Sequence, residues 1–133
     1  ITPNIINYSD KLRAQNIFLR KIGSRSEMIE ELKEYRALAY LGHKSDIFTL
    51  TCEESAKLCL PLITFGIGSI SDRVQHNETG FLAKNDQEFA DYTIKLLNNN
   101  DFYLDLRKKM HQIRHKNSWV DIANQWIENF LSE

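Results

Sequence analysis

No residue type is present in the excess that would mark a specialised class of protein. The 133 residues include 17 Lys and Arg against 18 Asp and Glu, which gives a formal net charge of −1. Such a balance excludes the dominant positive field of a general nucleic-acid-binding surface. The two cysteines, Cys52 and Cys59, have the spacing of neither a zinc site nor a redox pair. The sequence also lacks a recognisable signal peptide and an apolar run long enough to span a bilayer.

What remains is the composition of an ordinary globular domain. Apolar residues make up 42% of the chain and charged residues 26%. A chain of this length can bury a core without disulfides or a structural metal. We therefore expect residues 1–133 to form one domain, located in the cytoplasm, in which both thiols are reduced.

Short apolar runs in the first half of the chain predict strands. Residues 16–22 and 62–65 are rich in β-favouring side chains, and each run is followed by a glycine. The unbroken apolar run 37–41 is typical of a strand buried on both faces. We expect a further short extended piece at residues 47–50.

Capping patterns predict where two helices begin. Ser24 and Glu27 have the spacing of a capping box, in which each side chain bonds the other residue's backbone N–H. Thr51 and Glu54 have the same spacing and predict a second helix start. This second helix must end before Pro61, which lacks the N–H that a continuing helix needs.

Three helices are predicted to close the chain, with starts near residues 85, 100 and 118. Each has an apolar stripe at helical spacing. In the first the stripe is Phe89, Ala90, Ile94 and Leu97, in the second Phe102, Leu106, Met110 and Ile113, and in the third Trp119, Ile122, Ala123, Trp126, Ile127, Phe130 and Leu131. Such stripes are usually core-facing. Alternating strands and helices predict an α/β fold, a Rossmann-like parallel sheet flanked by helices.

The stretch from Asp46 to Pro61 combines features of a ligand site. Asp46 and Glu54 are two carboxylates eight positions apart, one in a loop and the other at a predicted helix start. A turn that ends in a helix N-terminus can hold a phosphate, and a neighbouring carboxylate can hold sugar hydroxyls. This combination predicts a site for a nucleotide or a nucleotide sugar.

The order of motifs from residue 16 to residue 133 resembles the C-terminal, donor-binding half of the retaining GT-B glycosyltransferases of group 1, or family four. In that family a Glu-Gly-Phe-Gly-Leu loop is followed by Glu-Ala-Met-Ala-Cys-Gly-Leu-Pro. Residues 46–50 (Asp-Ile-Phe-Thr-Leu) and 54–61 (Glu-Ser-Ala-Lys-Leu-Cys-Leu-Pro) are similar to these motifs. A later Gly-Glu-Thr-Gly-Phe-Leu turn resembles residues 77–82, and a Ser-Trp helix start resembles residues 118–121. In that family the last helix packs back across the domain junction, which implies that part of its apolar stripe is exposed in a fragment.

The resemblance implies a role for each matched position. Asp46 would lie against the transferred sugar as the catalytic-site acid, and Glu54 would accept hydrogen bonds from the ribose. The backbone of Thr49 and Leu50, in the loop with Phe48, would approach the diphosphate. The turn containing Lys21 and Ile22 would frame the base. His43 and Lys44 lie three and two positions before Asp46 and could help to neutralise a phosphate.

The same resemblance implies an enzyme, a hexosyltransferase-type transferase that acts in polysaccharide biosynthesis of the bacterial cell envelope. Its donor is a nucleotide-diphosphate sugar, with a front-face transfer that needs no metal or other cofactor. The acceptor, a glycan or a lipid-linked glycan, would bind an N-terminal domain outside this chain. We therefore expect a fragment that is inactive alone, from a protein associated peripherally with the cytoplasmic face of the inner membrane.

Other interpretations of these residues stay open. Glu54 could simply complete a capping box, and Asp46 could be a solvated loop acid. His111 and His115 have a spacing that can bind zinc, but Gln112 breaks the zinc-protease pattern, so we interpret both as exposed helix residues. Because Ile47 and Thr49 replace the two loop glycines, the chain could be a non-catalytic nucleotide-sugar-binding relative. A flavodoxin-like interaction module is the remaining alternative.

Overall fold

The computed structural model describes residues 23–114 and 118–130. The predicted strand at 16–22, together with the candidate site residues Lys21 and Ile22, lies outside them. The described elements, in chain order, are α2 (Arg25–Lys33), β1 (Leu38–Ala39), α3 (Leu50–Lys57), β2 (Leu62–Thr64), the 3₁₀ helix η1 (Gly68–Asp72), β3 (Gly80–Leu82), α4 (Asp86–Asn98), α5 (Asn100–Arg114) and α6 (Trp119–Phe130).

The described strands form one parallel sheet in the order β1-β2-β3. Leu62 of β2 pairs with Leu38 on one side and with Gly80 on the other. Gly80 lies so close to β2 that an added Cβ would stand 2.2 Å from the carbonyl oxygen of Leu62. A glycine is therefore needed for β3 to pair in this register. The prediction of an α/β fold with a parallel sheet is confirmed.

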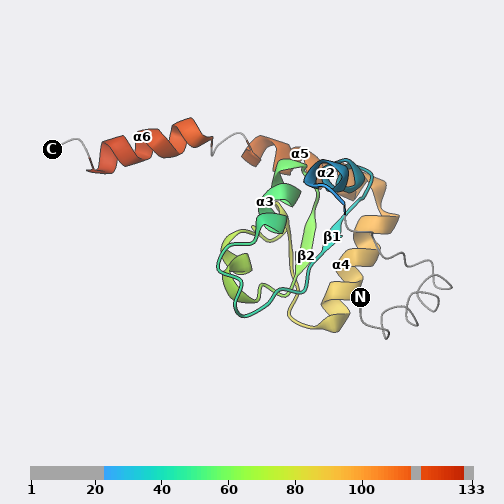
Figure 1. Ribbon diagram of the computed structural model, residues 1–133. Coiled ribbons are helices and arrows are strands. Elements are labelled where there is room, and N and C mark those ends of the chain that lie inside the picture. Colours follow the sequence, from blue (N-terminus) through green and yellow to red (C-terminus); the bar gives the residue numbers. More distant parts are fainter. Residues whose placement is uncertain (1–22, 115–117, 131–133) are drawn as a thin grey trace.

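Helices cover both faces of this sheet, as Figure 1 shows with α3 and α4 on opposite sides of the strands. Successive residues of β2 point to opposite faces, so Leu62 and Ile63 belong to different hydrophobic clusters. One cluster joins the sheet to α4 and α5 and consists of Ile63, Phe81, Leu96, Tyr103 and Leu106. The other joins it to α3 and η1 and consists of Cys52, Leu62, Ile70 and Val74.

The strand at 37–41 is shorter and more exposed than its apolar run predicts. Only Leu38 and Ala39 form β1, Ala39 is exposed, and Leu41 is 60% exposed. Among the described strands β1 stands at the edge of the sheet, so one side of it has no neighbour there. The prediction of burial on both faces was therefore wrong for these residues, whereas β2, with Leu62 to Thr64 all buried, matches its prediction.

Helix starts agree with the predictions at α2, α4 and α6. Ser24 and Glu27 form the full capping box of α2. Asn85 caps α4 by accepting from the backbone N–H of Glu88. Ser118 caps α6 by accepting from the N–H of Asp121, whose carboxylate accepts from Ser118 in return.

The apolar stripes of the C-terminal helices are only partly buried as predicted. In α5 the stripe is confirmed, with Leu106 and Met110 each 2% exposed. In α4 the prediction is confirmed for Phe89, which packs against the cluster, but it was wrong for Ala90, Ile94 and Leu97, which are exposed. Tyr92 and Leu96 face the sheet in their place. α6 buries none of its residues and extends away from the sheet in Figure 1. The expectation of a core-facing stripe on that helix is thus not met in the described residues, whereas exposure of part of the stripe, as the resemblance implies for a fragment, agrees with them.

Candidate functional site

Three loops meet at the edge of the sheet where the strands end, which we call the carboxyl edge. They are residues 40–49 after β1, 65–67 after β2 and 83–85 after β3. Ligands of open α/β sheets bind outside the carboxyl ends of the strands. The loop after β1 contains most of the predicted site residues, and these are His43, Lys44, Asp46, Phe48 and Thr49.

The first part of this loop is a compact turn closed by the Asp46 side chain. The Asp46 carboxylate oxygen Oδ2 accepts the backbone N–H of His43 at 2.8 Å and the hydroxyl of Tyr40 at 3.0 Å. The N–H of Asp46 donates to the carbonyl of His43 at 2.9 Å, and the N–H of Ser45 donates to His43 Nδ1 at 3.1 Å. Asp46 is therefore fixed by its own loop rather than being a freely solvated acid.

The start of η1, immediately after the turn that follows β2, packs directly against this loop. The N–H of Ser69 donates to the carbonyl of Asp46 at 2.9 Å. Gly68 has a φ of +73°, and an added Cβ would lie 2.7 Å from the carbonyl oxygen of His43 and 2.9 Å from that of Asp46. A positive φ and so close an approach both favour glycine at this position. The two turns therefore hold each other in place.

Helix α3 begins earlier than its capping pattern predicts. Thr49 is the N-cap residue, with φ −101° and ψ 100°, and Leu50 is the first helical residue. The prediction of a capping box at Thr51 and Glu54 was wrong, because both residues lie inside the helix. The predicted extended piece at 47–50 was also wrong, since these residues form a bend and then the helix start.

The N-terminus of α3 contains an unpaired buried hydroxyl. Thr49 is 6% exposed, and its Oγ1 makes no hydrogen bond to any residue that the structure describes. Its side chain does not cap the helix. The N–H of Cys52 donates to the carbonyl of Thr49 at 3.1 Å, and the N–H groups before it in the first turn have no partner within the helix. Phe48 and Leu50 on either side are 58% and 61% exposed. Unsatisfied donors and the positive end of the helix dipole thus coincide at the carboxyl edge.

Glu54 lies in α3, about one turn after the first helical residue, Leu50, and makes its contacts with other residues than Asp46 does. Its Oε1 pairs with Nε of Arg25 at 3.0 Å, and its side chain is 13% exposed, whereas that of Arg25 is 71% exposed. No hydrogen bond links Asp46 and Glu54 among the described residues. The two predicted acids therefore belong to separate hydrogen-bonded groups on the same loop and helix.

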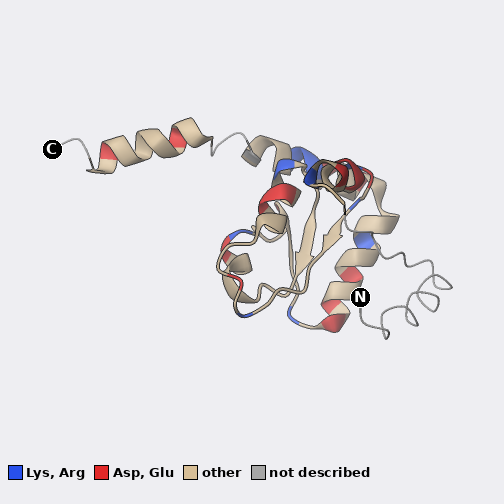
Figure 2. Cartoon of the chain, in the orientation of Figure 1, with Lys and Arg blue, Asp and Glu red and all other residues tan. Residues whose placement is uncertain are grey.

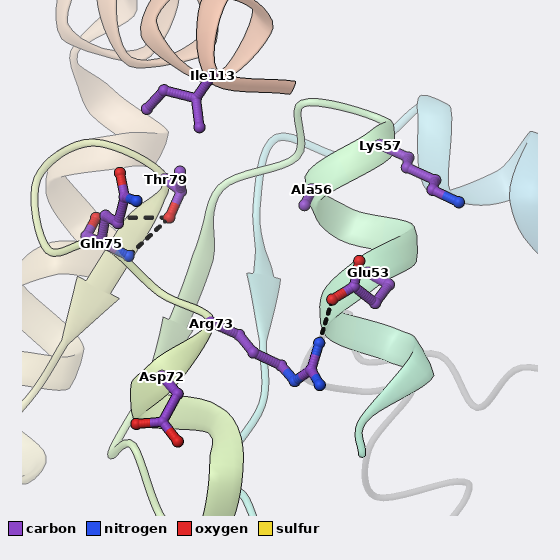
Figure 3. Close-up of a pocket in the computed structure, with 8 residues that line it drawn as sticks. All are labelled: Glu53, Ala56, Lys57, Asp72, Arg73, Gln75, Thr79 and Ile113. Carbon is purple, nitrogen blue, oxygen red and sulfur yellow. Dashed lines mark hydrogen bonds and ion pairs between the residues drawn. The ribbon is translucent and has the colours of Figure 1, made fainter. Parts of the chain in front are cut away.

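The adjacent acid, Glu53, forms a different ion pair, with Arg73. The Arg73 guanidinium also lies over the Phe48 ring, 4.1 Å from its centroid, so it joins α3 to the loop after β1. Figure 3 shows Arg73 reaching across to Glu53 at a cavity of about 340 Å³. A second cavity of about 470 Å³ is lined by Phe48, Arg73 and the first turns of α6.

The pKa values of two groups beside the site, Tyr40 and Cys52, are shifted by their surroundings. The pKa of Tyr40 is raised, first because its hydroxyl donates to the Asp46 carboxylate and further because of desolvation. Burial likewise raises the pKa of the Cys52 thiol, which the nearby Arg73 partly offsets. Both groups therefore stay protonated at neutral pH.

Basic residues do not concentrate at this edge, since Lys and Arg positions are spread over the described elements in Figure 2. Lys44 and Lys84 lie in two of the loops at the edge. In the part of the chain that the structure describes, no three His, Cys, Asp or Glu residues lie together as metal ligands do. His111 is exposed on α5, and His115 lies outside the described residues. None of the described helices is long and apolar enough to cross a membrane.

Sequence reasoning missed Tyr40, Arg25 and Arg73, each of which bonds a predicted site residue or its neighbour. Arg25 is 29 positions from Glu54 and Arg73 is 20 positions from Glu53. No periodic pattern links such pairs. Tyr40 had a weak signal, since it directly follows the two strand residues of β1 and is therefore at the carboxyl edge.

Comparisons with known proteins show the family of this chain. The chain is 25% identical over 123 residues to a GDP-Man:Man(3)GlcNAc(2)-PP-Dol alpha-1,2-mannosyltransferase of Dictyostelium discoideum, and the alignment covers 92% of this chain. The chain spans about a quarter of that relative, 24% of its length. No solved structure gives a significant match. The sequence profile of the family described as "Glycosyl transferases group 1" matches residues 6–116. The chain therefore belongs to the group 1 glycosyltransferases, and its parallel α/β fold is that of their Rossmann-like C-terminal domain.

Proposed function

We propose that this chain binds the nucleotide-sugar donor of a glycosyltransferase at the carboxyl edge of its sheet. The observation that carries the proposal is the buried Thr49 hydroxyl without a described partner at the N-terminus of α3. A buried hydroxyl that makes no hydrogen bond is unfavourable, and a phosphate oxygen would satisfy it together with the free N–H groups of the helix.

The diphosphate would therefore lie at Thr49 and Leu50, with its negative charge at the positive end of α3. During transfer the bond between the sugar and the diphosphate breaks, and negative charge develops on the leaving diphosphate. Preorganised N–H donors stabilise that charge without reorganising. The proposed site uses no metal, and we expect chelators to leave donor binding unchanged.

The sugar would lie against Asp46, and the ribose would donate to Glu54. A carboxylate suits vicinal hydroxyls because it can accept two charge-assisted hydrogen bonds. Glu54 is paired with Arg25, so ribose binding requires this pair to open. Arg25 is largely exposed and can move without leaving a buried charge.

The relative's printed name makes GDP-mannose the first donor to test. Its acceptor is a dolichol-linked oligosaccharide, and a lipid-linked or free glycan is the acceptor class that we propose here. A role in polysaccharide biosynthesis of the bacterial envelope remains a prediction, as does a place at the cytoplasmic face of a membrane. In each case the acceptor would contact parts of the full-length protein other than this chain.

The proposal is tested by calorimetric titration of the full-length protein with GDP, UDP and ADP and with their sugar conjugates. Two variants are compared with wild type. Thr49→Val keeps the side-chain shape and removes the unpaired hydroxyl, and Glu54→Ala removes the ribose acceptor. Each should lower affinity for the preferred nucleotide roughly tenfold or more, because hydrogen bonds to charged groups contribute about 1.5–3 kcal/mol.

Thr49→Val provides a sharp control because it should affect affinity and stability differently. Removing a buried hydroxyl without a partner should leave the free energy of unfolding unchanged or raise it. Retained stability with weakened binding would support a phosphate at Thr49. Unchanged affinity in both variants, or no binding of any nucleotide by the wild-type protein, would overturn the proposed function.

A further inference from the structure

The Asp46 carboxylate is held on one side only. Its oxygen Oδ2 accepts two hydrogen bonds, from the Tyr40 hydroxyl at 3.0 Å and from the His43 N–H at 2.8 Å. For Oδ1 the described residues offer no hydrogen-bond donor. One oxygen is thus used for positioning, and the other remains available to accept a bond from a ligand hydroxyl.

The two donors differ in how firmly they are held. The His43 N–H belongs to the same short turn as Asp46 and moves with it. Tyr40 instead follows β1, and its N–H donates to the carbonyl of Ile63 in β2 at 2.9 Å. The Tyr40 side chain also packs against the hydrophobic cluster under α3. The Tyr40 hydroxyl therefore connects Asp46 to the sheet, because Tyr40, the first residue of the loop, is itself hydrogen-bonded to β2.

We propose that Tyr40 is a positioning residue for donor recognition, holding the Asp46 carboxylate so that its free oxygen meets a hydroxyl of the transferred sugar. The inference rests on the proposed function, because it takes Asp46 as the group that contacts the sugar. A bond from the sheet fixes the direction of the carboxylate before the donor binds, and preorganised groups bind with less loss of freedom. Tyr40 itself touches no substrate in this arrangement.

The consequence can be measured as a sugar increment, defined as the ratio of affinities for the nucleotide sugar and for the nucleoside diphosphate alone. Tyr40→Phe keeps the ring and removes the hydroxyl. We expect it to reduce the sugar increment about three- to tenfold while affinity for the diphosphate stays unchanged. Loss of folding would instead lower both affinities together. Tyr35→Phe is the matched control, because Tyr35 is 51% exposed and its backbone N–H donates to Leu32 at the end of α2, not to the loop after β1.

A double-mutant cycle tests whether Tyr40 acts through Asp46. Asp46→Asn should reduce the sugar increment by itself, and adding Tyr40→Phe to it should then have little further effect. Equal losses from Tyr40→Phe in both backgrounds would overturn the inference. So would an unchanged sugar increment in Tyr40→Phe when wild type and Tyr35→Phe bind normally, which would leave the proposed function intact.

A second measurement needs no ligand and keeps the two proposals separable. Titration of Tyr40 by NMR should show a pKa above the ordinary tyrosine value, since the Asp46 carboxylate accepts its proton and the Cys52 thiol also lies near it. In Asp46→Asn this pKa should return towards the ordinary value. An unshifted Tyr40 in wild type would overturn the positioning role directly. A wild-type protein that binds no nucleotide would overturn the proposed function and the role of Tyr40 in it together.

Discussion

The two faces of the sheet are covered by hydrophobic clusters of different kinds. The cluster under α4 and α5 is rich in aromatic residues, and Phe81 stacks on Tyr92 with ring centroids 4.6 Å apart. The cluster under α3 contains smaller side chains, among them Cys52, Ile70 and Val74. It lies directly beneath the loops of the candidate site, and the aromatic cluster faces helices that carry no predicted site residue.

We therefore expect a division between the two faces of the sheet, in which only the cluster under α3 affects the candidate site. Substitutions in the aromatic cluster should change stability with little effect on ligand binding in the molecules that remain folded. Substitutions in the cluster under α3 should change both stability and ligand binding, because Ile70 of η1 lies close to Gly42 in the loop after β1. The predictions below test this division, beginning with the largest effect.

Phe81→Ala should give the largest loss of stability. Phe81 is fully buried and contacts Tyr92 and Phe102. Truncation of a buried phenylalanine removes its burial and leaves a cavity, which costs about 3–5 kcal/mol. Denaturant unfolding would measure the loss. Nucleotide affinity, corrected for the folded fraction, should be unchanged.

Ile70→Ala is the counterpart under α3 and is also fully buried in wild type. It should cost about 2–5 kcal/mol of stability by the same mechanism. In contrast to Phe81→Ala, it should also weaken nucleotide binding per folded molecule. Equal effects of the two variants on binding would refute the division between the faces.

Gly68→Ala and its control Gly66→Ala should lose similar stability but differ in ligand affinity. Both glycines have a positive φ, so each substitution should cost about 1–2 kcal/mol from backbone strain. A Cβ at Gly66 would first meet the flexible end of Leu82, at 3.0 Å, whereas a Cβ at Gly68 would press on the carbonyls of His43 and Asp46. Calorimetry should therefore show a marked loss of affinity only in Gly68→Ala. A similar loss in Gly66→Ala would mean that strain in the turn, and not pressure on Asp46, is responsible.

Much of the fold followed from local patterns, and the errors have local causes too. Ser24 is the only strong capping residue before Glu27 at the required spacing, so the start of α2 was predicted correctly. Thr49 and Thr51 both qualify before α3, and the pattern selected the wrong one because Glu54 completes a capping-box spacing with Thr51. In α4 two apolar stripes compete, and only the position of the aromatic cluster decides that Tyr92 and Leu96 face inward.

The sequence predicts which loop forms the candidate site, but it does not predict the contacts that hold the side chains of that loop. Asp46, Thr49 and Leu50 do lie together, because they are close in sequence. The roles of Tyr40, Arg25 and Arg73 depend on contacts that form only when the sheet and its helices assemble. One further feature, the backbone conformation at the end of α3, could have been predicted from the sequence. Where the resembled motif has a glycine before Leu-Pro, this chain has Cys59, and the structure gives Cys59 a φ of +51°.

Cys59 leads to a prediction of intermediate size. The N–H groups of Cys59 and Leu60 donate to the carbonyls of Ala56 and Ser55, which is the hydrogen bonding of a Schellman motif with Cys59 at its left-handed position. Cys59→Gly removes the strain of a side chain there, and Cys59→Val increases it. We expect the glycine variant to be more stable than the valine variant by about 1–2 kcal/mol. Denaturant unfolding under reducing conditions would show it, and a valine variant as stable as the glycine one would contradict the assigned backbone.

The smallest effect concerns α6, a described helix that contributes no residue to either cluster. The side chain and the backbone N–H of Ser118 donate to the Asp121 carboxylate, and these hydrogen bonds lower the pKa of Asp121 below its ordinary value. A lowered pKa means that the cap stabilises the helix at all pH values above the ordinary aspartate pKa and is lost as the pH falls through the lowered value. Helicity of α6, followed by NMR from the amide of Asp121, should therefore fall only in strongly acidic solution.

Asp121→Asn should abolish this pH dependence, while Asp101→Asn, a change in the first turn of α5, should leave it in place. Because α6 buries none of its residues against the sheet, the transition should leave the amides of β2 unaffected, and a simultaneous change there would show that α6 is coupled to the core after all.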